Sequence, residues 1–376
     1  MQSYDILVRG SGCVGRSLAL ALGSKGLRVA LLGSAEASGR QRADVRAYAL
    51  NAASVSLLRE LKVWDAMPAD AVTPVFDMRI QGHGQGDRET HAGSLGFSAW
   101  QQGVSELAFI VDAGALEQQL AQALRYAQHV EVVASPVPAS LEALCEGRES
   151  ARRAELGVGF HPQRYGQTAI AARLVADQAH QGVARQWFRS PDVLALLPFD
   201  RPQPERSYGL VWSLPEDRVP ELLRMSEPDF EAALMQATGA EAGSLRLASE
   251  RQSWPLAMAR ADSVCGPGWV LLGDAAHLVH PLAGQGLNLG LADVVALRDV
   301  LVQREAWREP GDIKLLRRYE RQRLWPTLAM TELTDGLLKL FAADAPVLEG
   351  LRAQGMNWLD RATPLKRWLT SRALGA

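Results

Sequence analysis

The chain has 376 residues, of which 47% are hydrophobic and 22% are charged, so it can bury a large core and form roughly two domains. Its formal net charge of −2 provides no basic field, and we expect no nucleic-acid partner. The three cysteines, Cys13, Cys145 and Cys265, lie far apart without metal-site spacing, which indicates a reducing compartment. We expect no secretory signal, because residues 1–8 lead directly into a strand. We expect no membrane span, because no apolar run reaches about 20 residues.

A glycine-rich turn follows the first predicted strand. Residues 4–9 form an apolar run typical of a buried strand, and residues 16–25 have helical periodicity before a second apolar run. Gly10, Gly12 and Gly15 lie between that strand and the helix in a G-x-G-x-x-G pattern. This placement is the context of a dinucleotide-binding fingerprint, in which glycines allow a pyrophosphate to approach. The alternative is a glycine-rich turn without a ligand.

The second strand, at residues 27–32, lacks the acid that usually holds the adenosine ribose at its end. Gly33 occupies that position, and the nearest acid is Glu36. Either Glu36 reaches back from the loop, or the ribose has no carboxylate partner.

The next part of the chain mixes helices with short strands. A helix is predicted at residues 44–61, where apolar residues recur at helical spacing. Residues 72–112 alternate apolar runs with turns, which is typical of antiparallel strands. An amphipathic helix begins at Asp112, and a short strand follows at residues 130–133.

A second sheet is expected in the middle of the chain. Its predicted strands are rich in β-branched and aromatic residues with partial alternation, which favours an antiparallel sheet with one covered face. These strands are residues 165–175, 182–188, 193–199 and 207–213. A helix at residues 216–238 and a returning strand at residues 245–254 complete this part.

A strand, a loop and a helix are then predicted near residue 270. Residues 269–272 form a short apolar run, Gly273 and Asp274 end it, and helical periodicity begins at Leu287. A helix N-terminus presents free N–H groups that favour an anion or an electron-rich oxygen, and Asp274 can accept hydrogen bonds from hydroxyls. This combination suits a flavin, with the ribityl chain on Asp274 and the N1–C2=O edge at the helix start.

The run G-D-A-A-H-x-x-x-P-x-x-G-Q-G-x-N at residues 273–288 resembles the second flavin motif of FAD-dependent aromatic hydroxylases, and most of all those of ubiquinone biosynthesis. The resemblance extends over most of the chain. It implies that NAD(P)H reduces bound FAD, that O₂ adds at flavin C4a, and that the hydroperoxide hydroxylates an aromatic ring. The flavin carries the hard chemistry, while the protein supplies orientation and a dry cavity.

The resemblance also implies roles for individual residues. Arg46 approaches the cofactor, and backbone amides at residues 284–286 stabilise charge on the reduced flavin. No side chain is assigned as a catalytic acid or base, and no metal is expected, since His277 and His280 are too few ligands. The residues predicted to bind the cofactor are Gly10, Gly12, Gly15, Glu36, Arg46, Asp274, Pro281, Gly284, Gln285, Gly286, Leu287 and Asn288.

One family motif is altered here. The family carries D-G-x-x-S-x-x-R, which touches the cofactor and substrate regions, after a strand meander. Residues 146–153 retain the spacing with Glu146 in place of the aspartate, and the meander is mostly missing. A carboxylate longer by one methylene moves its oxygen enough to matter in a positioned site. Residues 146–153 are therefore either a drifted site or a surface connection.

The predicted fold is α/β: a Rossmann-like FAD-binding domain of the group A flavin monooxygenase type, an antiparallel-sheet substrate domain and C-terminal helices. The FAD-binding domain is placed at residues 1–160 and 261–330, the substrate domain at 161–260, and the helical region at 331–376. In an enzyme of this type the sheet covers the flavin, and the candidate lining residues are Trp187, Phe188, Leu196, Phe199 and Trp212.

The predicted function is hydroxylation of an aromatic ring by an NAD(P)H-using, FAD-dependent monooxygenase, with a polyprenylated phenol of ubiquinone biosynthesis as substrate and O₂ as co-substrate. Gly33, Glu146 and the missing meander keep two alternatives open. One is a degenerate or non-catalytic flavin-binding subunit of a biosynthetic assembly. The other is a flavin oxidoreductase with a different reaction.

The C-terminal segment, residues 356–372, determines where we expect the protein to work. Leu365, Trp368 and Leu369 have i, i+3, i+4 spacing beside cationic residues, which suits a lipid interface. These side chains either pack on the body of the protein or attach it reversibly to an anionic membrane. The expected location is cytoplasmic, with peripheral contact to the inner face of the membrane.

Overall fold

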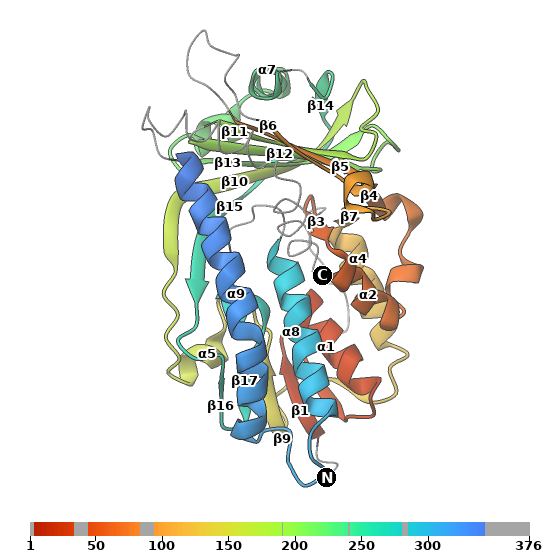
Figure 1. Ribbon diagram of the computed structural model, residues 1–376, viewed down its shortest axis with the longest axis vertical. Coiled ribbons are helices and arrows are strands. Elements are labelled where there is room, and N and C mark those ends of the chain that lie inside the picture. Colours follow the sequence, from red (N-terminus) through yellow and green to blue (C-terminus); the bar gives the residue numbers. More distant parts are fainter. Residues whose placement is uncertain are drawn as a thin grey trace.

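The computed structural model describes residues 4–33, 44–82, 94–189, 191–239, 241–279 and 285–342. Two large sheets dominate it, one in the lower half and one in the upper half of Figure 1. The lower sheet has six strands in the order β16-β17-β9-β1-β2-β8. These strands are β1 (Tyr4–Arg9), β2 (Val29–Leu32), β8 (Val130–Val133), β9 (Ala139–Leu144), β16 (Cys265–Gly266) and β17 (Trp269–Leu271).

The lower sheet is parallel except for the pair β16–β17. Ile6, Leu7 and Val8 of β1 are fully buried, as expected of a parallel strand that is covered on both faces. The predicted strands at residues 4–9 and 130–133 are confirmed. Strand β9 was not predicted, although it lies between β1 and β17 at the centre of the sheet.

Helices cover this sheet and bury its core. α1 contacts α4 and α8, and α8 contacts α9, which lies beside it in Figure 1. The Tyr319 hydroxyl of α9 donates a hydrogen bond to the Leu271 carbonyl of β17 at 3.0 Å. The helices of this half are α1 (Cys13–Gly23), α2 (Ala52–Glu60), α4 (Ala113–Leu124), α5 (Ala151–Glu155), α8 (Gln285–Val302) and α9 (Ile313–Ala342).

The upper sheet has nine strands, with the order β18-β15-β10-β13-β12-β11-β5-β6 and β14 paired to β10. The pairs are antiparallel except β11 with β5, so the predicted antiparallel sheet is confirmed with one parallel pair. Its strands are β5 (Asp77–Gly82), β6 (Ser94–Ser98), β10 (Gln163–Ala176), β11 (Val183–Arg189), β12 (Asp192–Phe199), β13 (Ser207–Pro215), β14 (Leu245–Leu247), β15 (Gln252–Arg260) and β18 (His277–Leu278).

The segment at residues 216–238 was predicted as one helix but forms two, α6 (Val219–Arg224) and α7 (Glu227–Thr238). Ser226 separates them, because its hydroxyl accepts a hydrogen bond from the Asp229 N–H and so starts a new helix. Helix α7 covers the outer face of the upper sheet (Figure 1). The strand predicted at residues 245–254 is divided between β14 and β15.

The prediction that a helix begins near Asp44 was wrong. Residues 47–50 form strand β3 of a small sheet in the order β3-β7-β4. The helix starts later, where the Asn51 side chain accepts a hydrogen bond from the Ser54 N–H at 2.9 Å. The strands of this small sheet are β3 (Ala47–Leu50), β4 (Val72–Val75) and β7 (Ala108–Asp112).

Short helices also connect these elements, among them α3 (Ala99–Gln102), η1 (Trp64–Ala66) and η2 (Ala69–Ala71). None of the helices in the described part of the chain combines the length and the apolar composition needed to cross a membrane. The segment at residues 356–372 lies outside the described residues.

Candidate functional site

The three glycines of the first turn have different physical roles. Gly10 has a φ of +104°, and a Cβ there would lie 2.3 Å from the carbonyl oxygen of Cys145, the residue that follows β9. A Cβ on Gly15 would lie 1.9 Å from the Gly10 carbonyl oxygen, so this glycine lets α1 pack closely on the turn. Gly12 has no atom within 4 Å of its added Cβ and faces the large cavity. Gly12 therefore leaves backbone open for a ligand.

Gly33 explains the absent acid at the end of β2. Its φ is +150°, a conformation that side-chain-bearing residues rarely adopt. A Cβ there would lie 2.6 Å from the Ser11 hydroxyl oxygen, so an aspartate could not fit without moving the glycine-rich turn. Glu36 lies outside the described residues, and its contact with a ribose stays a prediction.

Asp274 lies in η4 (Gly273–Ala275), the short turn that follows β17. Its carboxylate is accessible from the large cavity, yet the surrounding protein removes much of its water. This desolvation raises the pKa of Asp274 above its ordinary value, although His277, Arg148 and Arg46 oppose the shift. A carboxylate in such a place gains from a ligand that donates hydrogen bonds to it.

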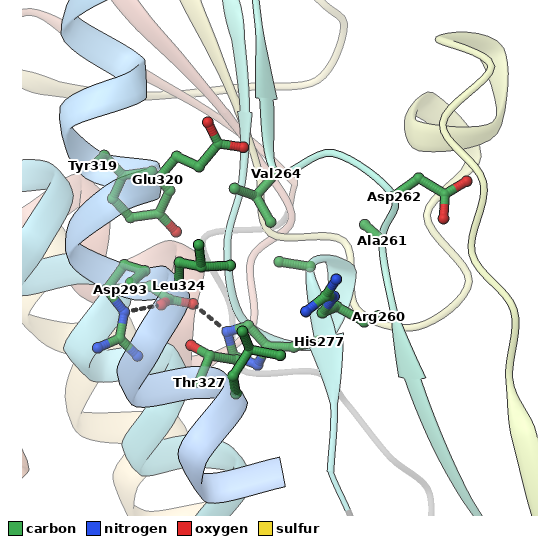
Figure 2. A pocket seen from close by; sticks show the side chains of 13 residues that line it. Arg260, Ala261, Asp262, Val264, His277, Asp293, Tyr319, Glu320, Leu324 and Thr327 are labelled. Carbon is green, nitrogen blue, oxygen red and sulfur yellow. Dashed lines mark hydrogen bonds and ion pairs between the residues drawn. The ribbon is translucent and has the colours of Figure 1, made fainter. Parts of the chain in front are cut away.

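A buried ionic network fixes the turn that carries Asp274 (Figure 2). Asp293 of α8 is fully buried and accepts hydrogen bonds from the Gly273 N–H at 2.9 Å and from Arg323 Nε at 2.5 Å. Its other contact is with His277 Nε2 at 2.7 Å. Burial alone would raise the pKa of Asp293, but His277, Arg323 and the Gly273 N–H together lower it.

Asp293 was not predicted from the sequence as part of the site. A signal was present, because this aspartate interrupts the apolar run of α8 between Leu291 and Val294. A charge that is placed on a buried helix face must have partners, and its partners here are the turn at residue 273 and helix α9. In Figure 2 the side chains of Asp293 and His277 point toward each other.

Arg46 lines the large cavity, as expected of a residue near the cofactor. Its guanidinium makes a bidentate pair with Asp44, with Nε–Oδ1 at 2.9 Å and Nη2–Oδ2 at 2.7 Å, and lies 3.5 Å from Glu117. Burial opposes the charge, but the hydrogen bonds to Asp44 and the nearby carboxylate hold the pKa of Arg46 above its ordinary value. The pair fixes the guanidinium at the cavity wall.

The start of α8 is partly described. Gly286 and Leu287 line the cavity, while Gln285 begins the helix. Asn288 has a different place: its Nδ2 donates to the Ala49 carbonyl at 2.7 Å, and its Oδ1 accepts from Ser54 Oγ at 2.7 Å. This side chain ties α8 to β3 and α2, so its contact with a cofactor stays a prediction. Pro281 and Gly284 lie outside the described residues.

The altered motif at residues 146–153 is a capped turn rather than a surface connection. The Ser150 hydroxyl donates to Glu146 and accepts from the Arg153 N–H at 3.2 Å, which starts α5. Arg153 is buried, donates to the Ala275 carbonyl at 2.9 Å, and stacks on the Phe160 ring at 3.7 Å. This arginine therefore links the motif to the turn that carries Asp274.

One large cavity, of about 480 Å³, lies between the lower and upper sheets. Gly147 and Arg148 of the capped turn line it, together with Gly12, Arg46 and Asp274. Predicted residues from three distant parts of the sequence thus meet at one cavity. Among the described residues, no group of three or more histidine, cysteine or acidic side chains could hold a metal ion.

The predicted aromatic lining was wrong. Trp187, Leu196 and Trp212 point to the opposite face of the upper sheet, where they pack in the cluster beneath α7. Phe188 and Phe199 belong to two separate clusters and do not line the cavity. The partial alternation of apolar and polar residues along these strands did not identify which face of the sheet helices cover. A shift of one residue along a strand exchanges its two faces.

Beside Trp254 of β15, the cavity lining on the upper sheet includes many small residues. They occupy alternate positions on neighbouring strands, so their side chains leave a space beneath the sheet. They are Ala169, Ala171, Ala184, Ala195, Gly209 and Val211. The cavity therefore combines a polar lower wall with a largely apolar upper wall.

The described residues fit a bound dinucleotide. Gly12 leaves a backbone segment open, the N-terminus of α8 places Gly286 and Leu287 at the cavity, and Asp274 offers a desolvated carboxylate. These features suit a pyrophosphate, an electron-rich ring edge and a sugar alcohol respectively.

Comparisons with known proteins agree with this fit. A family model described as FAD binding domain matches residues 98–334. Ubiquinone hydroxylase UbiL of Rhodospirillum rubrum is 30% identical, with 99% of this chain and 89% of the relative covered. The 3-demethoxyubiquinol 3-hydroxylase of Escherichia coli is also 30% identical, with 100% of this chain and 99% of the relative covered.

A solved structure shares the fold. The crystal structure of PqsL, a probable FAD-dependent monooxygenase from Pseudomonas aeruginosa, superposes with a TM-score of 0.74. The alignment covers 94% of this chain and 99% of that protein, at 19% sequence identity.

Proposed function

We propose that this chain, which belongs to the FAD-dependent aromatic hydroxylases of the ubiquinone-biosynthesis type, hydroxylates the ring of a polyprenylated phenol. Family membership makes it an FAD-dependent monooxygenase that uses NAD(P)H. The observation that supports the substrate class is the cavity, whose polar lower wall suits the cofactor and whose apolar upper wall suits a ring.

The proposed reaction balances as follows. A ring C–H becomes C–OH with one atom of O₂, the other atom leaves as water, and NAD(P)H with a proton is oxidised to NAD(P)⁺. Bound FAD supplies the oxygen-activating chemistry that protein side chains lack.

Residues of this chain bind and orient the cofactor. Gly12 would accommodate the pyrophosphate, Asp274 would accept hydrogen bonds from the ribityl hydroxyls, and the N–H groups at the start of α8 would stabilise the electron-rich ring edge. The Asp293 network keeps the Asp274 turn in place, and the pair with Asp44 fixes the Arg46 guanidinium at the cavity wall. The small side chains of the upper sheet exclude water while leaving room for a ring.

The lipid tail of the substrate suggests contact with a membrane. We propose reversible attachment through residues 356–372, and a place in a biosynthetic assembly that passes on hydrophobic intermediates. Co-sedimentation with anionic liposomes at low and high salt tests the attachment. A chain ending after Asp360 should sediment less than the full chain, and equal sedimentation of a folded truncated chain would exclude this anchor.

The function itself is tested with purified protein. We expect flavin absorbance bands near roughly 370 and 450 nm, the cofactor's own, and NAD(P)H oxidation that is stimulated by a phenol. Under ¹⁸O₂, one labelled oxygen should appear in the ring product. Oxidation of NAD(P)H without label in the product would favour a different flavin reaction, and absence of flavin even after FAD is added would favour the non-catalytic subunit.

A further inference from the structure

Gln186 of β11 stands out on the largely apolar upper wall of the cavity. It pairs with Ala195 of β12 on one side and with Ile80 of β5 on the other. Ala195 in turn pairs with Val211, and Val211 with Ala171. Directly paired residues share a face of a sheet, so Gln186 lies at one end of a row of small apolar side chains that line the cavity.

The carboxamide of Gln186 has no hydrogen-bond partner in the part of the chain that the structure describes. Two other glutamines of the same sheet are paired. Gln81 donates to Glu241 at 2.7 Å, and Gln167 donates to the Pro191 carbonyl at 2.9 Å. Gln186 thus presents a donor and an acceptor to the cavity, and the side chains paired with it, Ala195 and Ile80, can satisfy neither.

A polar group that loses water without finding a partner is costly, and an apolar ring seated against Gln186 would impose this cost. A ring that carries a neutral oxygen substituent avoids this cost, because the substituent forms a hydrogen bond with the amide. The amide N–H can donate to a hydroxyl, methoxy or carbonyl oxygen, and the amide oxygen can accept from a hydroxyl. The small side chains of the row leave space for the ring beside it.

We propose that Gln186 determines substrate specificity by hydrogen bonding a neutral oxygen substituent on the aromatic ring. This inference rests on the proposed function and adds to it the substituent that the upper wall of the cavity recognises. Gln186 binds the ring and takes no part in the reaction. A ring without an oxygen substituent binds more weakly, because it leaves the Gln186 amide without a hydrogen-bond partner.

Three ring compounds of similar size separate donor from acceptor recognition: 4-propylphenol, 4-propylanisole and propylbenzene. Their dissociation constants are measured on the FAD-loaded protein from the change in flavin absorbance. The wild type should bind 4-propylphenol about tenfold more tightly than propylbenzene, as expected for one net hydrogen bond. Gln186→Leu should bring this ratio close to one.

Gln186→Glu keeps the shape but leaves an acceptor only. This variant should still bind 4-propylphenol more tightly than propylbenzene. It should bind 4-propylanisole about tenfold more weakly than the wild type does, because the ether oxygen loses its hydrogen-bond donor. This variant tests the proposal even if Gln186→Leu does not fold. The matched control is Gln81→Leu on the neighbouring strand, which pairs with Trp187 on the opposite face and should change no ratio.

The outcomes separate this inference from the function on which it rests. If the wild type incorporates labelled oxygen but both Gln186 variants keep the wild-type ratios, the inference is wrong and the function stands. If the wild type neither retains FAD nor oxidises NAD(P)H with any phenol, both are wrong.

Discussion

The imidazole of His277 lies 2.7 Å, through Nε2, from Oδ2 of Asp293, and both residues are buried beneath the turn that carries Asp274. The same aspartate oxygen accepts the Gly273 N–H, so one carboxylate holds the start and the end of this turn. His277 belongs to the flavin motif by sequence, but this contact gives it a positioning role.

Replacing Asp293 with asparagine should therefore destabilise the protein. The variant keeps the side-chain shape but leaves Arg323 buried beside a neutral partner, and breaking such a pair costs about 3–5 kcal/mol. Urea unfolding measures the difference. Asp299→Asn is the matched control on α8, because that residue's contact with Arg298 is far more exposed. Equal loss in both variants would contradict the structural role of Asp293.

The Asp293 network also predicts a pH dependence. The pKa of Asp293 is lower in the folded protein than its ordinary value of 3.8, so the ionised form favours folding. This contribution is fully present above pH 3.8 and is lost as the pH falls through the lower folded value. The free energy of unfolding of the wild type should fall in that acid range more steeply than that of Asp293→Asn. Parallel curves would show that another group is responsible.

Local sequence patterns predicted much of the fold, because the spacing of apolar residues within one helix or strand is enough to identify it. Strand β1, helix α4 and the four long strands of the upper sheet are examples. Strand β9 was missed because its polar residues Ser140 and Glu142 interrupt the apolar run, while Leu141 and Leu144 are fully buried. Its place between β1 and β17 depends on long-range pairing, which a local window does not contain.

Site residues could be predicted from the sequence where the backbone conformation or close packing allows only one residue type. Gly10 and Gly15 have no space for a Cβ, so the glycine pattern carries direct information about packing. Asp293 and Gln186 act through partners that are far away in the sequence or on neighbouring strands. Their roles could be seen only after the sheets were assembled, because the alternation of a strand does not reveal which face meets the cavity.

Asp274→Ala should weaken FAD binding by about tenfold to a hundredfold, the effect of losing one charge-assisted hydrogen bond of roughly 1.5–3 kcal/mol. Equilibrium dialysis or absorbance titration measures the dissociation constant. Asp262→Ala is the control, since that exposed carboxylate lies outside the large cavity, 3.9 Å from the exposed His161. The assignment fails if both variants bind FAD equally well.

Gly33→Ala should destabilise the protein more than Gly103→Ala. Both glycines have positive φ, but only at Gly33 would the new Cβ approach Ser11 Oγ to 2.6 Å, while Gly103 has open space. Backbone strain costs about 1–3 kcal/mol, and the contact with Ser11 adds to it at Gly33. Thermal unfolding of both variants tests this, and equal melting temperatures would show that the turn yields to the added methyl group.

Glu146→Asp should lower turnover, although it restores the acid that the family carries. In this chain the longer side chain reaches the Ser150 hydroxyl and accepts the Arg152 N–H at 3.3 Å. An aspartate retracts the carboxylate by about one methylene, so Ser150 loses a partner and the turn before α5 loosens. Gly147 and Arg148 of this turn line the cavity. A looser turn should therefore position the substrate and the cofactor less well.

The measurement is the rate of phenol-stimulated NAD(P)H oxidation together with the FAD dissociation constant. Glu149→Asp is the control, because that side chain is 84% exposed and contacts only its neighbour Arg148 at 3.3 Å among the described residues. We expect a drop of about tenfold in turnover for Glu146→Asp, equivalent to about 1.4 kcal/mol, and no change for the control. An increase for Glu146→Asp would instead mean that the chain has drifted from a better site, and that the Ser150 contact does not support catalysis.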